Sequence, residues 1–161
     1  MMQDLLVRPA QPDDIALVAE LIHELAIYEE LGDSVSYCEE DIYQALFSER
    51  PAAEVLIGEL NGKAEGFALY FHNYSTFLGR RGLYLEDLFV RPHARGKGLG
   101  KLLLKELAKV AVQRNCARME WFVLDWNEPS IQFYKSLGAA PMDGWKIFRM
   151  TDEKIKELSH G

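Results

Sequence analysis

The sequence predicts a mixed α/β fold, and three observations lead to this class. Apolar runs at residues 54–60 and 64–71 flank Asn61-Gly62, a pair that favours the type I′ turn of a β-hairpin. A third apolar run over 82–90, dense enough for a central strand, leads through closely spaced glycines into a helical pattern from about residue 98. Helical and extended patterns then alternate along the rest of the chain.

Turn and capping signals define the elements that precede the hairpin. Residues 4–8 form a short apolar run that Pro9 ends, which predicts a first strand. Asp13 and Asp14 can cap the next helix, because a carboxylate accepts hydrogen bonds from the free N–H groups at a helix start. Its apolar positions recur at helical spacing: Ile15, Val18, Leu21, Ile22, Leu25 and Ala26. A short helix is expected over residues 39–47.

Helices and strands also alternate after the glycines, with no repeat or linker between them. One domain over residues 1–161 is therefore expected. Its remaining elements, in chain order, are a helix over 98–114, a strand over 118–124, a helix over 129–137 closed by Gly138, a strand over 145–150, and a last helical turn capped by Asp152.

Composition narrows the classes of function. The N-terminus lacks the features of a signal peptide, and no apolar run approaches the roughly 20 residues that span a bilayer, so a cytoplasmic protein without a membrane partner is expected. A net charge of −7 argues against nucleic acid as a partner and favours cationic ones. The cysteines, Cys38 and Cys116, and the four histidines have no metal-ligand spacing, so no metal site is expected.

The glycines between residues 95 and 101 predict a phosphate-binding turn. Gly96, Gly98 and Gly100 are framed by basic side chains, and bare backbone N–H groups at a helix N-terminus attract a pyrophosphate. A Walker A loop would end in Gly-Lys-Ser/Thr, and a dinucleotide fingerprint would read G-x-G-x-x-G, and neither is present. A tight turn that needs glycine only for its positive φ is the alternative.

The same segment resembles a known family. Arg95-Gly96-Lys97-Gly98-Leu99-Gly100 matches the Q/R-x-x-G-x-G/A signature of the GCN5-related N-acetyltransferases, which bind acetyl-CoA there. Further segments look like the spermidine/spermine (diamine) N-acetyltransferase branch of that family, and the resemblance spans nearly the whole chain. These segments are Ile22–Glu29, Leu83–Asp87, Trp126–Lys135 and Gly144–Phe148.

The resemblance implies the fold and the acetyl-CoA site. It implies a mostly antiparallel central sheet flanked by helices, in which strands 82–90 and 118–124 splay apart around the cofactor. The backbone of Leu88, Phe89 and Val90 would then pair with the pantetheine arm, as an added β-strand does. The amides that would hold the pyrophosphate belong to Arg95, Gly96, Lys97, Gly98, Leu99, Gly100 and Lys101, and Asn127 would lie near the cofactor.

Acetyl transfer to an amine requires a proton acceptor and a proton donor. A primary amine has a pKa of about 10.4 and is protonated at pH 7, so a base must take its proton. Glu86, in an otherwise apolar strand, is the candidate, and strand alternation predicts that its neighbour Asp87 faces the opposite side of the sheet. Tyr134 matches the position of the family's acid tyrosine; the alternative is a core aromatic residue.

The acceptor is expected to be a small amine. In the polyamine branch the pair that matches Tyr28-Glu29 borders the substrate channel, and Trp126 and Trp145 are candidate wall residues. Glu86 and Asp87 are also expected to contact the substrate. Where that branch typically carries an Asp and a Trp, this chain has Ser75 and Phe77, so thialysine or another amino-acid-like amine is an alternative to a polyamine. Arg80 and Arg81 could then pair with a substrate carboxylate.

Two other functions and the assembly remain open. The fold could bind acyl-CoA without turnover, as a sensor, although Glu86 and Tyr134 would then be unnecessary. It could also acetylate protein N-termini or lysines, which requires a broad peptide groove. The resemblance implies a homodimer in which residues 140–161 lie near the partner.

Overall fold

A computed structural model describes residues 2–161. The chain divides into two compact units, one ending at Phe122 and the other comprising Val123–Gly161. The first unit contains the sheet and three α-helices, and the second contains two α-helices and the segment that joins them.

The first unit is built on a five-stranded sheet with the strands in sequence order. Its three ladders from β1 to β4 are antiparallel, and β4 pairs with β5 in parallel, which confirms the predicted mostly antiparallel sheet. The strands are β1 (Leu5–Pro9), β2 (Glu54–Leu60), β3 (Lys63–Ser75), β4 (Arg80–Val90) and β5 (Arg118–Trp121). At the β2–β3 turn, Asn61 has φ 53° and Gly62 φ 79°, as the predicted type I′ hairpin requires.

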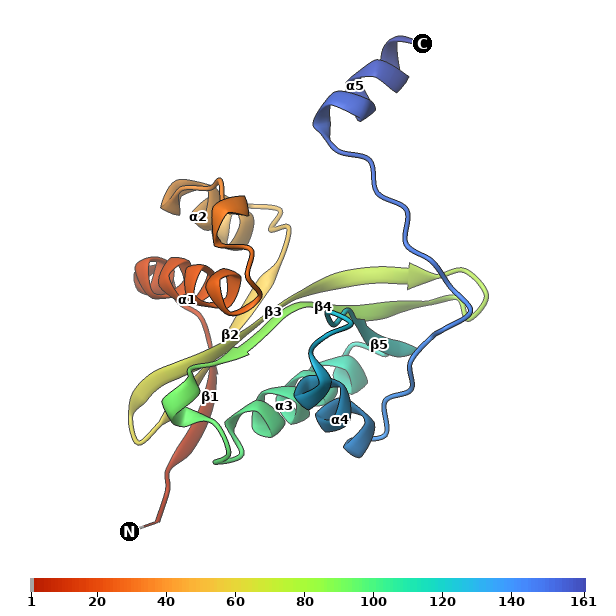
Figure 1. Ribbon diagram of the computed structural model, residues 1–161. Coiled ribbons are helices and arrows are strands. Elements are labelled where there is room, and N and C mark those ends of the chain that lie inside the picture. Colours follow the sequence, from red (N-terminus) through yellow and green to blue (C-terminus); the bar gives the residue numbers. More distant parts are fainter. Residues whose placement is uncertain (1) are drawn as a thin grey trace. The chain divides into compact units, whose positions relative to one another are not determined.

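Helices cover both faces of this sheet. In Figure 1, α1 (Ile15–Tyr28) and α2 (Glu39–Phe47) lie on one face, and α3 (Leu99–Gln113) lies on the other. The apolar stripe of α1 packs on Ile57, Phe67 and Phe89 of the sheet. On the α3 face the helix approaches closely enough that a Cβ on Gly58 would lie 3.0 Å from Leu99 Cδ1, so a larger residue there would have to displace the leucine side chains of α3.

The β3–β4 ladder contains a bulge that changes which way the β4 side chains face. Leu69 pairs with Asp87, but the next β3 residue pairs with Leu85, so Glu86 is an extra residue. Phe89 belongs to the core that lies under α1. Leu85 is also buried, but it is not part of that core. In a regular strand Leu85 and Phe89, four residues apart, would face the same side of the sheet. They face opposite sides, so the alternation of side chains reverses at the bulge. As a result, Glu86 and Asp87 both face α1. The prediction that they face opposite sides was wrong.

The second unit consists of α4 (Glu128–Ser136), a segment without regular structure, and α5 (Asp152–His160). Gly138 follows α4 with φ 93°, as predicted for a helix end. The predicted strand over 145–150 is absent from the structure, and β5 ends at Trp121 rather than 124. A strand needs a hydrogen-bonded neighbour, and the described part of this unit contains no other strand to pair with residues 145–150.

The helix caps differ in detail from the prediction. Asp14 accepts the Gln11 N–H at 2.7 Å and pairs with Arg8, so it fixes the entry to α1 and does not bond to the first N–H groups of the helix. Asp152 is the first residue of α5, and Thr151 occupies its N-cap position. Asp14 thus occupies the predicted N-cap position of α1 without a side-chain capping bond, whereas the N-cap of α5 lies one residue before the predicted Asp152.

Candidate active site

The glycine-rich segment forms an exposed loop between β4 and α3. Gly96 and Gly98 have φ 75° and 92°, and Gly98 is the N-cap of α3. The first helical hydrogen bond runs from the Leu102 N–H to the Gly98 carbonyl, so the N–H groups of 99–101 are those that a helix start leaves to other partners. With the exposed side chains of Lys97 and Lys101, this loop has the donors and charge for a pyrophosphate.

The last residues of β4 offer backbone groups on the side away from β3. The β4–β5 ladder ends at Leu85, and no strand within residues 2–161 continues it beside 86–90. The Arg91 N–H bonds to the Glu65 carbonyl across the β3–β4 ladder, so alternation turns the backbone groups of Val90 and Leu88 away from β3. Those of Phe89 face β3, and its ring lies in the core.

Three carboxylates interact at the face of β4 that α1 covers. Burial, then the charges of Glu86 and Glu29, raise the pKa of Asp87 to about 7. Burial, and then the charge of Glu86, also raise the pKa of Glu29 at the end of α1. The neighbouring Tyr37 phenol has a raised pKa from burial and from the charge of Asp87, and it donates to the Ala19 carbonyl at 3.0 Å. This concentration of negative charge suits a cationic ligand.

An apolar recess of about 260 Å³ lies beside these carboxylates, at the end of α1. It is lined by Glu24, Ile27, Tyr28, Phe89 and Pro92. The centroids of the Tyr28 and Phe89 rings are 6.4 Å apart, and the Arg95 guanidinium lies 4.5 Å from the centroid of the Tyr28 ring. The recess therefore joins the acidic end of α1 to the loop that follows β4.

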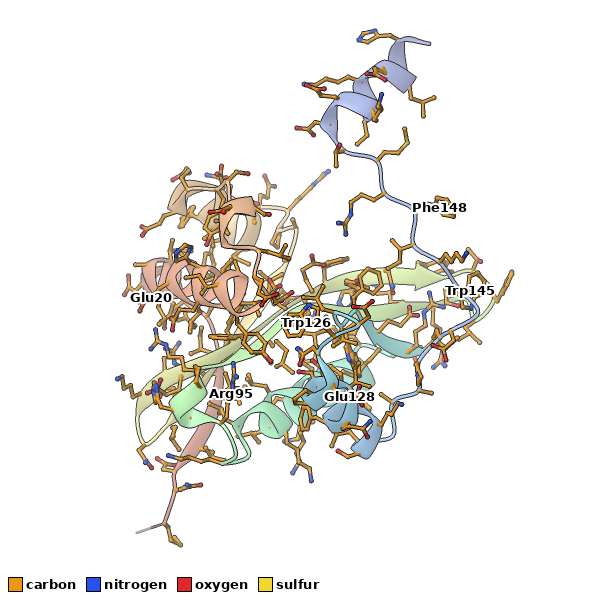
Figure 2. All side chains as sticks on the ribbon, in the orientation of Figure 1. Glu20, Arg95, Trp126, Glu128, Trp145 and Phe148 are labelled. Carbon is orange, nitrogen blue, oxygen red and sulfur yellow. The ribbon has the colours of Figure 1, made fainter. Side chains whose placement is uncertain are left out.

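The second unit contains the other predicted site residues. Asn127 is buried at the N-cap of α4, and its side-chain oxygen accepts the Ser130 N–H at 3.4 Å. Tyr134 is half-buried on the same helix. Trp126 and Trp145 are exposed and lie on different segments of this unit (Figure 2). The structure thus brings Tyr28, Glu29 and the β4 carboxylates together in the first unit.

The residues that replace the polyamine branch's Asp and Trp lie at the β3–β4 turn. Ser75 is buried and its Oγ accepts the Leu78 N–H at 3.3 Å, whereas Phe77 is 99% exposed. Arg80, considered as a partner for a substrate carboxylate, donates to Asn115 Oδ1 at 3.0 Å. This turn therefore supplies no carboxylate in the positions where the polyamine branch has its acid.

The described residues hold neither a candidate metal site nor a candidate membrane-spanning helix. Among residues 2–161, no three His, Cys, Asp or Glu side chains are placed to hold a metal ion. In the same part of the chain, no helix has the length and apolar character needed to cross a membrane.

Sequence relatives and solved structures agree with this fold. The profile of the "Acetyltransferase (GNAT) family" matches residues 24–139. The thialysine N-epsilon-acetyltransferase of Bos taurus is 38% identical over 165 residues, covering 96% of each chain. The L-ornithine N5-acetyltransferase of Arabidopsis thaliana is 30% identical and covers 94% of this chain and 86% of its own. An integron cassette protein from V. cholerae has a TM-score of 0.80 with 29% identity over 98% of both chains.

These matches define an acetyltransferase fold. The chain belongs to the acetyltransferase (GNAT) family. The family and the enzyme class predicted from the glycine signature are thereby confirmed.

Proposed function

We propose that this enzyme transfers the acetyl group of acetyl-CoA directly to the terminal primary amine of a small cationic acceptor. The observation that carries the proposal is the placement of Glu29, Glu86 and Asp87 on one face, beside the apolar recess of Tyr28 and Phe89. An aliphatic ammonium ion needs this combination of carboxylates for its charge and apolar walls for its methylene groups.

Acetyl-CoA fits the residues that follow Glu86 and Asp87. The Leu88 and Val90 backbone groups that face away from β3 would bind the pantetheine arm, with Phe89 holding the strand in place. The loop amides from Gly96 to Lys101 would bind the pyrophosphate, because the loop is exposed and Gly96 and Gly98 have positive φ. The Arg95 N–H, expected in the same set, donates to the Pro92 carbonyl at 3.3 Å and so already has a backbone partner. When bound, the cofactor supplies an activated thioester. We also propose Asn127, the N-cap residue of α4, as a residue near the cofactor.

Proton transfer is assigned to two side chains. Glu86, exposed at the bulge, accepts the proton of the bound ammonium directly or through water, and Asp87, whose pKa is raised to about 7, adds a partly ionised carboxyl to the same face. Tyr134 donates its phenolic proton to the departing sulfur, and of the predicted residues 88–90 the backbone N–H of Leu88 or Val90, which faces away from β3, stabilises the developing oxyanion. Tyr28, Trp126 and Trp145 are proposed as walls of the acceptor site.

Within the class of small amines, the β3–β4 turn favours short, amino-acid-like acceptors. Ser75 and Phe77 supply no negative charge there, so the far end of a long polyamine would lack a partner. The similarity to enzymes named for thialysine and ornithine supports the same direction. Polyamines stay in the proposal as the longer members of the class.

The proposal is tested by measuring CoA release from acetyl-CoA with purified protein. The acceptors are putrescine, spermidine, spermine, thialysine, ornithine, lysine and a peptide amine. Turnover of one or more small amines supports the proposal, and the ratio of kcat/KM for thialysine and spermidine decides between its two arms. Turnover of the peptide alone would make the enzyme a protein acetyltransferase. Tight acetyl-CoA binding without any turnover would make it a sensor.

The assembly and setting complete the proposal. We propose a homodimer that functions in the cytoplasm, with residues 1–161 acting as one domain. Support comes from apolar side chains that the second unit leaves exposed: Trp145, Ile147, Phe148, Met150, Ile155 and Leu158. Light scattering measures the molecular mass in solution. The wild type should be a dimer, and Phe148→Ser should shift it toward monomer. A monomeric wild type would contradict the proposed homodimer. Limited proteolysis that separates the two units readily would contradict the single domain.

A further inference from the structure

Two arginines after β4 contact successive turns of α1. Arg91 Nη2 lies 2.9 Å from Glu24 Oε2, and its Nε donates to the same carboxylate at 3.1 and 3.2 Å. Four residues later, the Arg95 guanidinium carbon lies 4.5 Å from the centroid of the Tyr28 ring, one helical turn beyond Glu24. The segment leading into the cofactor loop therefore contacts the half of α1 that ends at Glu29.

The side chain of Arg95 is directed toward these rings by a second contact. Its Nε donates to the Val90 carbonyl at 2.8 Å, and its guanidinium also lies 5.6 Å from the centroid of the Phe89 ring. Figure 2 labels this residue close to the end of β4. Its backbone belongs to the cofactor loop, but its side chain faces the wall of the apolar recess. A guanidinium over two aromatic faces is attracted by both.

Arg91 is fixed in the same segment by a buried carboxylate. Glu65 on β3 is only 4% exposed and lies 3.6 Å from Arg91 Nη1, and His93 Nε2 lies 2.9 Å from the same group. A buried carboxylate without a partner is costly, so these contacts restrict how the segment can move. The contact between Arg91 and Glu24 thereby anchors the start of the loop, and Arg95 is the contact closest to the proposed acceptor site.

We infer that Arg95 is a positioning residue that couples cofactor binding to acceptor binding. The inference rests on the proposed function. Closure of the loop amides around a pyrophosphate restricts the backbone of Arg95, and its guanidinium restricts Tyr28 and the adjacent Glu29 in turn. Cofactor binding thus orders the acceptor site before the amine arrives. The amine then loses less conformational entropy on binding, so it binds more tightly to the cofactor complex. By linkage, the amine tightens cofactor binding by the same factor.

The first test follows hydrogen exchange on addition of CoA and needs no acceptor. In the wild type, CoA should slow exchange in the loop at 96–100 and in residues 25–31, which comprise the last turn of α1 and the three residues after it. In Arg95→Gln the loop should still be protected by saturating CoA, while the α1 protection is lost. Arg50→Gln removes an exposed arginine elsewhere and should behave as wild type. Loop protection without α1 protection in the wild type would overturn the inference, and no protection of the loop would instead overturn the proposed cofactor site.

The second test measures coupling directly in the unreactive complex of CoA and amine. Calorimetry gives the Kd of thialysine or spermidine with and without saturating CoA. We expect about five- to tenfold tightening in the wild type and in Tyr28→Phe, which keeps the ring, and little or none in Arg95→Gln and Tyr28→Leu. Equal Kd values with and without CoA in the wild type, or unchanged coupling in Arg95→Gln, would overturn it. Failure of every amine to bind or react would contradict the proposed function as well.

Discussion

Glu86 and Asp87 are neighbours in β4 and face the same side of the sheet, because the ladder with β3 gains one residue between Leu85 and Asp87. In a regular strand one of the two carboxylates would face α3 and its apolar core. The bulge instead places both beside Glu29, at the end of α1. One extra residue thereby gives the proposed amine site two carboxyl groups from β4, of which Asp87 has a raised pKa.

The Asp87 carboxyl makes folding stability depend on pH. Because its pKa is about 7 in the folded protein and near 3.8 when unfolded, the folded state binds more protons between these values. Stability from this group should therefore be highest below about pH 4, fall as the pH rises toward 7, and level off above it. The whole effect is on the order of 4 kcal/mol.

Asp87→Asn removes that titration. The variant should be more stable than the wild type at pH 8, and the difference should shrink or vanish at pH 4, as measured by urea unfolding at both values. Asp33→Asn serves as the charge-matched control, because Asp33 is exposed and lies shortly after the end of α1. This variant should show only a small, pH-independent change in stability. An Asp87→Asn variant less stable than the wild type at pH 8 would show that its carboxylate is favourably paired.

Glu86→Gln tests the proton acceptor. If Glu86 takes the proton of the bound amine, kcat/KM should fall about 10²- to 10⁴-fold, and most at lower pH, where the free amine is rarest. The pH–rate profile with the preferred acceptor measures this. A uniform loss at every pH would assign Glu86 a structural part.

Tyr134→Phe tests the proton donor. The substitution keeps the ring on α4 and removes only the hydroxyl, so acetyl-CoA affinity should remain nearly unchanged while kcat falls about 10²-fold or more. Calorimetry and single-turnover kinetics separate the two quantities. Unchanged turnover would remove Tyr134 from the acid role and leave it as a packing residue.

Gly98→Val tests the phosphate loop. Gly98 has φ 92°, and an added Cβ would meet only Leu5 Cδ1 at 3.6 Å, so the strain is in the backbone and costs about 1–3 kcal/mol. We expect lower thermal stability and at least tenfold weaker CoA binding. Gly79→Val imposes the same kind of strain at φ 64° on the β3–β4 turn and should lose stability without losing CoA affinity. CoA binding that survives Gly98→Val would move the phosphate site elsewhere.

Much of the fold followed from local signals. The Asn61-Gly62 turn, the helix at 39–47 and the glycine loop each depend on residues whose conformational preference is strong and local. The apolar spacing of α1 likewise predicted its buried face, because helix periodicity survives any packing partner.

The features that failed depend on partners distant in sequence. No local pattern marks Glu86 as an extra residue, because a bulge is defined by the strand opposite. The apolar residues from Trp145 to Met150 have strand propensity, but propensity without a neighbouring strand does not form a ladder. The contact of Arg95 with Tyr28 was missed for the same reason, since the phosphate motif explains an arginine there without any aromatic partner.

The end of α3 offers a stability test away from the site. Arg114 Nη1 and Nη2 bond to both oxygens of Glu54 at 2.6 and 2.8 Å, and Nη1 also lies 2.9 Å from His72 Nε2. His72 Nδ1 lies 3.2 Å from the Gly82 carbonyl, so Nδ1 carries the proton and Nε2 accepts from Arg114. The bonds from Arg114, with its charge, lower the pKa of Glu54 despite partial burial.

Arg114→Gln should therefore destabilise the protein in a pH-dependent way. A carboxylate with a lowered pKa stabilises the folded state at pH values above its pKa in the unfolded chain, here near 4.5. This stabilisation is lost as the pH falls through the pKa of the folded state. Both side chains are about one-third or more exposed, so solvent screening limits the loss at pH 7 to about 1 kcal/mol. Urea unfolding should show that loss at pH 7 and a smaller one at pH 3. The control is Lys109→Gln, in the exposed pair with Glu106 on the same helix, which should change stability by less than about 0.5 kcal/mol. An equal loss in both variants would mean that the Arg114 network contributes no more than a surface pair.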